Sequence, residues 1–240
     1  MRVRRVRVGE LHEGRLRLTG REAHHLARVL RVRSGDPVVV FDGAGQEAEG
    51  RVAAIDAQAV TVDVGPARTA SVEAPVEAEV AVALLKGDKL AQVVRQLTEL
   101  GVTRVRPIVT ARCDVPRLSA AKADRLRRVA AEAAKQAGRA RVPEVAEPVP
   151  LARLSWSGPA WIADPRARRG WHELDPARVA SGVPATLLTG PEGGFDDAEV
   201  AAAQERGAIP VRLGARTLRA ETAPVALLAA LLSRLDEGGA

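Results

Sequence analysis

The chain has 240 residues, of which 46% are apolar, 28% charged and only 2% aromatic, enough for one large domain or two smaller ones with an aliphatic core. Its single cysteine excludes a disulfide framework and favours a reducing compartment. No apolar run approaches the roughly 18 to 20 residues that span a bilayer, and no apolar signal region follows the basic N-terminus. These features predict a soluble, cytoplasmic protein that neither crosses a membrane nor depends on disulfides.

Positive charge is concentrated in two segments, although the net charge is only +6. Residues 1–33 hold ten arginines against three acidic residues, and residues 112–141 hold a second surplus. Such clusters are typical of a surface that binds nucleic acid, because the planar guanidinium suits phosphate and stacks on bases. Two solvated faces without a ligand are the alternative interpretation. The candidate RNA contacts are Arg2, Arg4, Arg5, Arg28, Arg31, Lys135, Arg139 and Arg141.

The first part of the chain predicts a small β-barrel with one helix, because short apolar strands are separated by tight turns. A helix is expected from Arg21 to Leu30, where Thr19 and Glu22 have the spacing of a capping box. The stretch 65–75 contains Pro, Thr and Ser and indicates a linker. We therefore expect one domain over 1–70 and a second over 76–240. Strands of the barrel are expected at 2–8, 15–18, 38–41, 47–55 and 59–64.

From residue 76 strands and helices alternate, which predicts an α/β fold with a largely parallel sheet and helices on both faces. In such sheets the site lies at the carboxyl ends of the strands. Thr222 and Pro224 suit the start of a last helix that is apolar all round, and this helix is expected in a core or a subunit interface. Strands are expected at 80–85, 105–109, 161–163, 185–188 and 209–213, and helices at 88–100, 119–138, 197–206 and beyond 222.

Two glycine-bearing loops follow neighbouring predicted strands. Gly190-Pro191-Glu192-Gly193-Gly194 follows one strand, and Leu213-Gly214 ends the next. Glycine lets a backbone approach a ligand closely, so the two loops are expected to enclose one small ligand. They lack the spacing of a Rossmann or P-loop motif, and plain strand-to-helix turns are the alternative. No metal site is predicted, because the adjacent His24 and His25 cannot share a helix face.

Several of these segments closely resemble the 16S ribosomal RNA uridine-N3 methyltransferase family, the RsmE type of the SPOUT superfamily. The most specific matches are Leu188–Phe195 with Glu199, and Leu213–Ala223. The resemblance is colinear over nearly the whole chain. Further matches are Lys86-Gly87-Asp88-Lys89, Glu99-Leu100-Gly101-Val102, residues 132–139 and residues 25–31.

The resemblance implies features that composition and spacing do not supply. The second domain should contain a deep trefoil knot, and S-adenosylmethionine should sit bent within it, held mainly by backbone groups. The first domain should be PUA-like and bind RNA, and the enzyme should be a homodimer with its sites at the interface. The implied cofactor-binding residues are Leu188, Thr189, Gly190, Glu192, Gly193, Leu213, Gly214, Leu218 and Thr222.

The expected activity is methylation of N3 of a uridine in 16S ribosomal RNA, either naked or in the small ribosomal subunit. Loss of the N3 proton leaves negative charge on the base, so a cation and a proton acceptor are needed. Arg219 is the candidate cation, and Glu221 the residue that orients it or relays the proton; a structural ion pair is the alternative for both. The alternative functions are methylation of a ribose 2′-OH by a related SPOUT enzyme, and a catalytically silent RNA-binding assembly factor.

Overall fold

The structure is a computed structural model that describes residues 4–173, 178–179 and 183–238. Its contacts divide the chain into two compact units. The first unit runs as far as Glu73 and also contains Ala134–Val142. The second comprises Ala74–Ala133 and the chain from Pro143 onward. Of the candidate RNA contacts, Arg2 lies outside the described residues.

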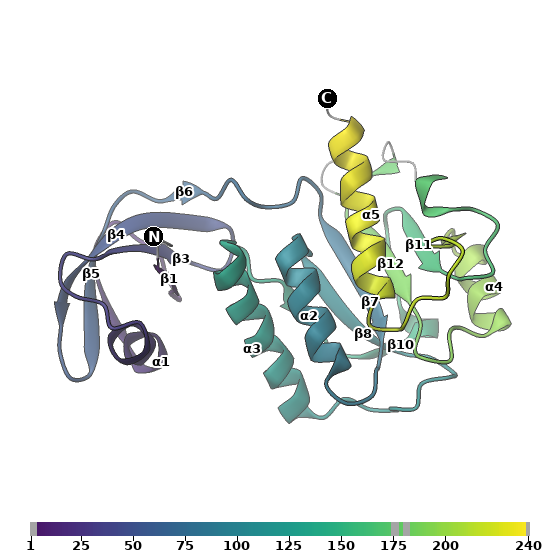
Figure 1. The fold of residues 1–240 in the computed structure, drawn as a ribbon, viewed down its shortest axis with the longest axis horizontal. Helices are drawn as coiled ribbons and strands as arrows, with labels where there is room; N and C mark the ends of the chain where they lie inside the picture. Colours follow the sequence, from purple (N-terminus) through teal and green to yellow (C-terminus); the bar gives the residue numbers. More distant parts are fainter. Residues whose placement is uncertain (1–3, 174–177, 180–182, 239–240) are drawn as a thin grey trace. The chain divides into compact units, whose positions relative to one another are not determined.

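The first unit is built on a six-stranded sheet (Figure 1). The strand order is β1-β3-β4-β5-β2, with β6 paired to β4, and of these pairs β1–β3 is parallel and the others antiparallel. Alternate residues such as Val38, Val40, Val60 and Val62 are buried, as expected when a sheet has one face on a core. The strands are β1 (Arg4–Arg7), β2 (Gly14–Thr19), β3 (Pro37–Phe41), β4 (Gln46–Ile55), β5 (Ala59–Val64) and β6 (Arg68–Thr69).

The helix of the first unit differs from the prediction. Instead of one α-helix, the structure has α1 (Gly20–His24) followed by the π-helical segment η1 (His25–Val29). The predicted capping box is wrong, because the Thr19 side chain makes no capping hydrogen bond. Glu22 is instead 2.5 Å from the ammonium of Lys135. A charge-assisted bond to a largely buried cation is stronger than the hydrogen bond to an amide that it replaces.

The second unit contains a seven-stranded sheet in the order β10-β8-β7-β12-β11-β13, with β9 paired to β8. Its strands pair in parallel. Val80–Ala83 of the central strand β7 are fully buried, which explains why this part of the strand is apolar at every position. The strands are β7 (Ala78–Ala83), β8 (Arg104–Val109), β9 (Glu144–Val145), β10 (Val149–Pro150), β11 (Ala160–Ala163), β12 (Ala185–Thr189) and β13 (Ile209–Val211).

Helices cover both faces of this sheet, as predicted (Figure 1). Helix α5 packs against α2, β12 and β7, whereas Val200 and Ala203 of α4 join the core on the opposite face. Gly101 ends α2 with a left-handed φ of 104°, and the Ser119 hydroxyl accepts a hydrogen bond from Lys122 N (3.3 Å) at the start of α3. In the described part of the chain, no helix has the length and apolarity to cross a membrane. The helices are α2 (Lys89–Leu100), α3 (Ala120–Ala137), α4 (Asp197–Glu205) and α5 (Ala223–Gly238), with short 3-10 turns η2 (Leu151–Arg153) and η3 (Trp171–Glu173).

Candidate functional site

A cavity of about 480 Å³ lies in the second unit where β11, β12 and β13 end. Its volume falls within the range of about 300 to 1,000 Å³ that is usual for small-molecule sites. Ala163 and Asp164 contribute the segment after β11, and residues 190–194 the loop after β12. Most of residues 213–221 line it after β13. The cavity therefore occupies the carboxyl edge of the parallel sheet, where ligands bind in folds of this class.

The loop after β12 turns so tightly that a side chain on its first residue would crowd the end of the loop. A Cβ on Gly190 would come within 3.1 Å of both the Gly194 carbonyl carbon and Phe195 N. Beyond the loop, α4 begins with a capping box in which Glu199 N donates to Asp196 (2.7 Å) and Asp196 N donates to Glu199 (3.0 Å). The loop is thus fixed between a buried strand and a capped helix.

The loop after β13 brings the two predicted catalytic residues to the cavity. Gly214 has a φ of 105°, a left-handed conformation that a side chain would strain. A turn follows in which the backbone N–H groups of Thr222 and Ala223 donate to Arg219 O at 2.9 and 3.0 Å. Both Arg219 and Glu221 line the cavity from this segment, just before α5 begins at Ala223.

The predicted cofactor-binding residues divide into two groups. Five line the cavity directly: Gly190, Glu192, Gly193, Leu213 and Leu218. Leu188 and Thr189 are fully buried in β12, with no exposed side-chain surface. Gly214 and Thr222 belong to the lining segments but do not themselves line the cavity. All nine residues therefore lie at one edge of the sheet. Leu188, Thr189, Gly214 and Thr222 lie next to the lining residues but do not line the cavity.

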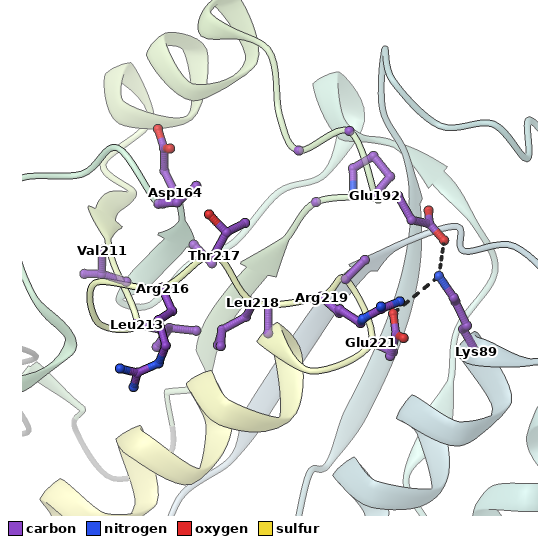
Figure 2. A pocket seen from close by; sticks show the side chains of 18 residues that line it. Lys89, Asp164, Glu192, Val211, Leu213, Arg216, Thr217, Leu218, Arg219 and Glu221 are labelled. Atoms are coloured by element: carbon purple, nitrogen blue, oxygen red, sulfur yellow. Dashed lines mark hydrogen bonds and ion pairs between the residues drawn. The ribbon is translucent and has the colours of Figure 1, made fainter.

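Lys89, the first residue of α2, lines the cavity although no role for it was predicted from the sequence. Lys89 Nζ lies 2.9 Å from Glu192 Oε1 and 3.4 Å from Glu221 Oε2, as Figure 2 shows. The hydrogen bond to Glu192 raises the pKa of Lys89 above its ordinary value. Partial burial favours the neutral form of Glu192, but the Lys89 ammonium and the backbone N–H groups of Glu192 and Lys86 together outweigh it and hold the pKa of Glu192 below its usual value. The available signal was the family-like segment Lys86–Lys89, to which no role was assigned.

One carboxylate oxygen at the cavity lies near a cation but accepts no hydrogen bond. Glu221 Oε2 is buried and accepts no hydrogen bond within the described residues, its nearest cation being Lys89 at 3.4 Å. A buried polar atom of this kind normally has a partner, so a ligand or an ordered water is expected to supply it. Glu221 pairs with Lys89 in the part of the chain that the structure describes, and Arg219 is exposed. Within the described residues, Arg219 and Glu221 therefore do not form the ion pair that was the alternative interpretation.

Asp164 is a second lining residue that the sequence did not suggest. It follows β11, is only 8% exposed, and accepts from Arg166 Nε at 3.1 Å. Arg166 also pairs with Asp197, and these two carboxylates raise the pKa of the guanidinium. A single aspartate after a strand gives no sequence signal of its own. Across the described ranges, no group of three or more His, Cys, Asp or Glu could hold a metal ion.

The candidate RNA contacts are not equally accessible. Arg28 and Arg31 are exposed, whereas Arg4 pairs with Asp36 and Arg5 with Glu47, both at 2.8 Å. Each of these four residues lies in the first unit.

The three candidates near the end of α3 belong to the first unit by their contacts, although the sequence suggested the catalytic domain. Lys135 and Arg139 are 8% and 2% exposed and pair with Glu22 and Glu73. Arg141 is half-buried, and its backbone N–H donates to Glu73 (2.9 Å). The cations of Lys135 and Arg139 thus pair with carboxylates inside the unit, which leaves Arg28 and Arg31 as the most exposed candidates.

Comparison with known proteins agrees with this geometry. Residues 72–232 match the family model of an RNA methyltransferase domain, and residues 18–65 match an RNA methyltransferase PUA domain. The ribosomal RNA small subunit methyltransferase E of Synechocystis sp. is 34% identical, with 95% of this chain and 76% of that protein aligned.

Two solved structures share the fold along the whole chain. The ribosomal RNA small subunit methyltransferase E of Neisseria gonorrhoeae, bound to S-adenosyl methionine, gives a TM-score of 0.88 at 26% identity over 97% of this chain and 98% of that one. A putative methyltransferase of Legionella pneumophila, in complex with the bound cofactor SAM, gives a TM-score of 0.87 at 28% identity over 97% and 98%. The chain therefore belongs to the ribosomal RNA small subunit methyltransferase E family.

Proposed function

We propose that this protein transfers a methyl group from S-adenosylmethionine to N3 of a uridine in the 16S ribosomal RNA of the small subunit. The observation that carries the proposal is the cavity between two glycine-bearing loops, with Arg219 and Glu221 on its wall. Membership of the methyltransferase E family supports it, and so do the two relatives whose structures hold the same methyl donor.

The residues of the cavity fit such a donor. Leu213 and Leu218 offer apolar surface for the adenine ring, and Gly190, Gly193 and Gly194 line the cavity without side chains. The carboxylates of Glu192 and Glu221 suit the positive charge of a sulfonium. We assign Leu188, Thr189, Gly214 and Thr222 to the support of these loops. When bound, the donor supplies a methyl group on a positively charged sulfur, which makes it transferable to a nitrogen.

Arg219 and Glu221 have separate tasks in this proposal. The N3–H of uracil must lose its proton as the new N–CH₃ bond forms, and negative charge then develops on the flanking carbonyl oxygens. The guanidinium of Arg219 stabilises that charge. Glu221 Oε2, which accepts no hydrogen bond within the described residues, takes the N3 proton, directly or through one water. Lys89 positions this carboxylate through the contact at 3.4 Å.

RNA binding is assigned to the first domain. We propose that residues 1–70 close into a PUA-like barrel and that residues 76–240 form the SPOUT methyltransferase domain. The exposed Arg28 and Arg31 are the preferred phosphate contacts, and Arg2, Arg4 and Arg5 near the start of the sequence are kept as further candidates. Arg141 is kept as a weaker candidate, whereas the burial of Lys135 and Arg139 favours a structural role.

We further propose a trefoil knot and a homodimer. Strand β11 lies between β12 and β13 in the sheet, while α5 returns to β12 and β7, so residues 212–222 must cross back over the strand ends. True knots are rare, and the family resemblance supports one here. Val225, Ala229 and Leu232 of α5 are apolar yet only half-buried, which supports a second copy on this helix. A ribosomal RNA substrate supports a cytoplasmic location.

The test is methyl transfer from labelled S-adenosylmethionine to small ribosomal subunits from a strain that lacks this activity. The RNA is then digested to nucleosides and analysed by mass spectrometry. We expect N3-methyluridine at a single position. A methylated ribose would show the related SPOUT activity instead, and no labelled nucleoside with either subunits or naked 16S RNA would favour a silent assembly factor.

A further inference from the structure

We propose that the first unit contains a groove that binds one nucleotide of single-stranded RNA. The groove lies between β2, the α1–η1 segment and the turn joining β4 to β5, and has a volume of about 770 Å³. This inference rests on the proposed function, because it takes RNA as the substrate, and it assigns a site that the function does not require. The residues that define it are Arg17, Thr19, His24, Arg28, Ile55 and Gln58.

The groove offers a cation for phosphate on two sides. Arg17 enters from β2 and Arg28 from η1, and both residues are exposed. Asp56 also lines the groove and lies 3.7 Å from the Arg17 guanidinium. Backbone N–H groups of Gln58 and Ala59 donate to Asp56 at 2.7 Å and hold its pKa below the usual value. Asp56 therefore stays ionised and offsets one of the two arginines, and the second arginine leaves the groove with a net positive charge.

The same walls provide what a base and a ribose need. Ile55 is an exposed apolar side chain, 39% accessible, against which a base can lie. Thr19 lacks its expected capping bond, so its hydroxyl faces no helix amide and can serve a ligand. The amide of Gln58 offers both a donor and an acceptor to a base edge. Cation, apolar surface and neutral hydrogen-bonding groups together match a nucleotide better than an acidic peptide.

The backbone beside the groove is unusual in two independent ways. Leu30 N donates to His25 O at 2.9 Å, five residues back, which makes η1 a π-helix. Arg31 then has a φ of 50°, the one left-handed non-glycine residue in the described chain. π-Turns and left-handed non-glycine residues are costly and persist mostly at functional sites. Here they shape the segment that presents Arg28.

Single-stranded RNA is the form of nucleic acid that suits this groove. A groove that accepts apolar and base-edge contacts needs an unstacked base, and a duplex buries its bases against one another. Sequence-specific RNA recognition generally uses such splayed nucleotides, with phosphate contacts that fix the register.

The test measures binding of a fluorescent single-stranded oligouridine RNA to the full-length protein across a range of salt concentrations. Each phosphate contact on a single strand contributes about 0.7 to the slope of log K against log salt. We expect Arg17→Ala and Arg28→Ala each to lower the slope by about 0.7, and the double variant by about 1.4. An RNA duplex of equal length should compete less well than the single strand.

Arg15→Ala is the matched control, because Arg15 lies on the same strand as Arg17, is exposed and pairs with Asp63 at 2.9 Å, but does not line the groove. Its slope should equal that of the wild type. Ala57→Glu places a negative charge in the groove at an exposed turn and should weaken binding, whereas Ala67→Glu, outside it, should not. Unchanged thermal unfolding of each variant confirms that it folds.

The groove is disproved if Arg17→Ala and Arg28→Ala keep the wild-type slope, or if Arg15→Ala loses as much. Competition by a glutamate peptide as strong as that by RNA would also overturn it. Methyl transfer to small subunits is measured in parallel, so the two proposals fail separately. If no N3-methyluridine forms but the arginine variants still lower the salt slope, only the proposed function is wrong. If methylation is normal but the variants keep the wild-type slope, only the proposed groove is wrong.

Discussion

Lys89 Nζ lies 3.4 Å from Glu221 Oε2 while it also contacts Glu192 Oε1 at 2.9 Å. One ammonium at the start of α2 therefore links the loops after β12 and β13 across the mouth of the cavity. Two carboxylates this close would otherwise repel each other, so the cation keeps both loops in place. This geometry indicates that Lys89 positions the carboxylates of Glu192 and Glu221 and does not itself transfer a proton.

Replacing Lys89 by methionine should lower kcat/KM by on the order of 10- to 100-fold, because a displaced catalytic group costs about that much. Lys89→Arg should recover part of the loss. Lys86→Met is the matched control, since Lys86 is an exposed lysine of the same segment that pairs with Asp114 at 2.9 Å, and its activity should be normal. Steady-state methyl transfer measures all three. Equal rates for Lys89→Met and the wild type would exclude the positioning role.

Arg219→Ala and Glu221→Gln should reduce kcat while leaving S-adenosylmethionine affinity near normal. Loss of one charge-stabilising donor generally costs 10²- to 10³-fold in kcat, and loss of a proton acceptor 10²- to 10⁴-fold. Single-turnover transfer with pre-bound donor separates chemistry from binding. Arg212→Ala, an exposed arginine near the loop but outside the cavity, serves as the control. Near-normal single-turnover rates in Arg219→Ala would contradict its assignment.

Gly190→Ala should weaken binding of the methyl donor by at least tenfold. The new Cβ would meet backbone atoms of Gly194 and Phe195 at 3.1 Å, so the loop must shift where the donor is proposed to bind. Calorimetric titration with S-adenosylmethionine measures the change. Gly9→Ala, where nothing lies within 4 Å of the added carbon, should bind as the wild type. Tight binding by Gly190→Ala would place the donor elsewhere.

The Lys89–Glu192 ion pair predicts a pH dependence of stability. The pKa of Glu192 is lowered on folding, so its stabilisation is present above the unfolded value of about 4.3 and is lost as pH falls through the lower folded value. The pKa of Lys89 is raised, so its contribution is present below about 10.4 and is lost as pH rises through the higher folded value. Melting temperatures of the wild type and Glu192→Gln should therefore differ at pH 7 and converge as pH falls through the lowered pKa of Glu192 or rises through the raised pKa of Lys89. A constant difference would show that charge is not the cause.

Sequence could predict the strands, the long helices and the glycine loops, because apolar periodicity and turn residues are local signals. It could not assign a role to Lys89, which meets Glu192 from 103 positions away. The capping box at Thr19 failed for the same reason, since Glu22 pairs with Lys135, 113 positions further along the chain. Ion pairs between residues far apart in the chain override the local preference for a capping box, and the spacing of residues in the sequence does not reveal them.

Arg139 is almost fully buried, so a structural role and a role in RNA contact predict different effects of its replacement. Its Nη2 lies 2.7 Å from Glu73, and the same carboxylate accepts from the backbone N–H groups of residues 140 and 141. Removing one partner of a buried ion pair generally costs about 3 to 5 kcal/mol. Arg139→Met should therefore destabilise the first unit by about 3 kcal/mol, whereas the exposed Arg28→Met should change stability by less than about 0.5 kcal/mol.

Hydrogen exchange of the amides in β3, β4 and β5 measures this difference within the first unit. Protection there should fall by about 100-fold in Arg139→Met, because each 1.4 kcal/mol corresponds to a factor of ten. RNA affinity should show the reverse order, with Arg28→Met the weaker binder once Arg139→Met is folded. Normal protection combined with lost RNA binding in Arg139→Met would instead make Arg139 a phosphate contact, which its burial in this unit argues against.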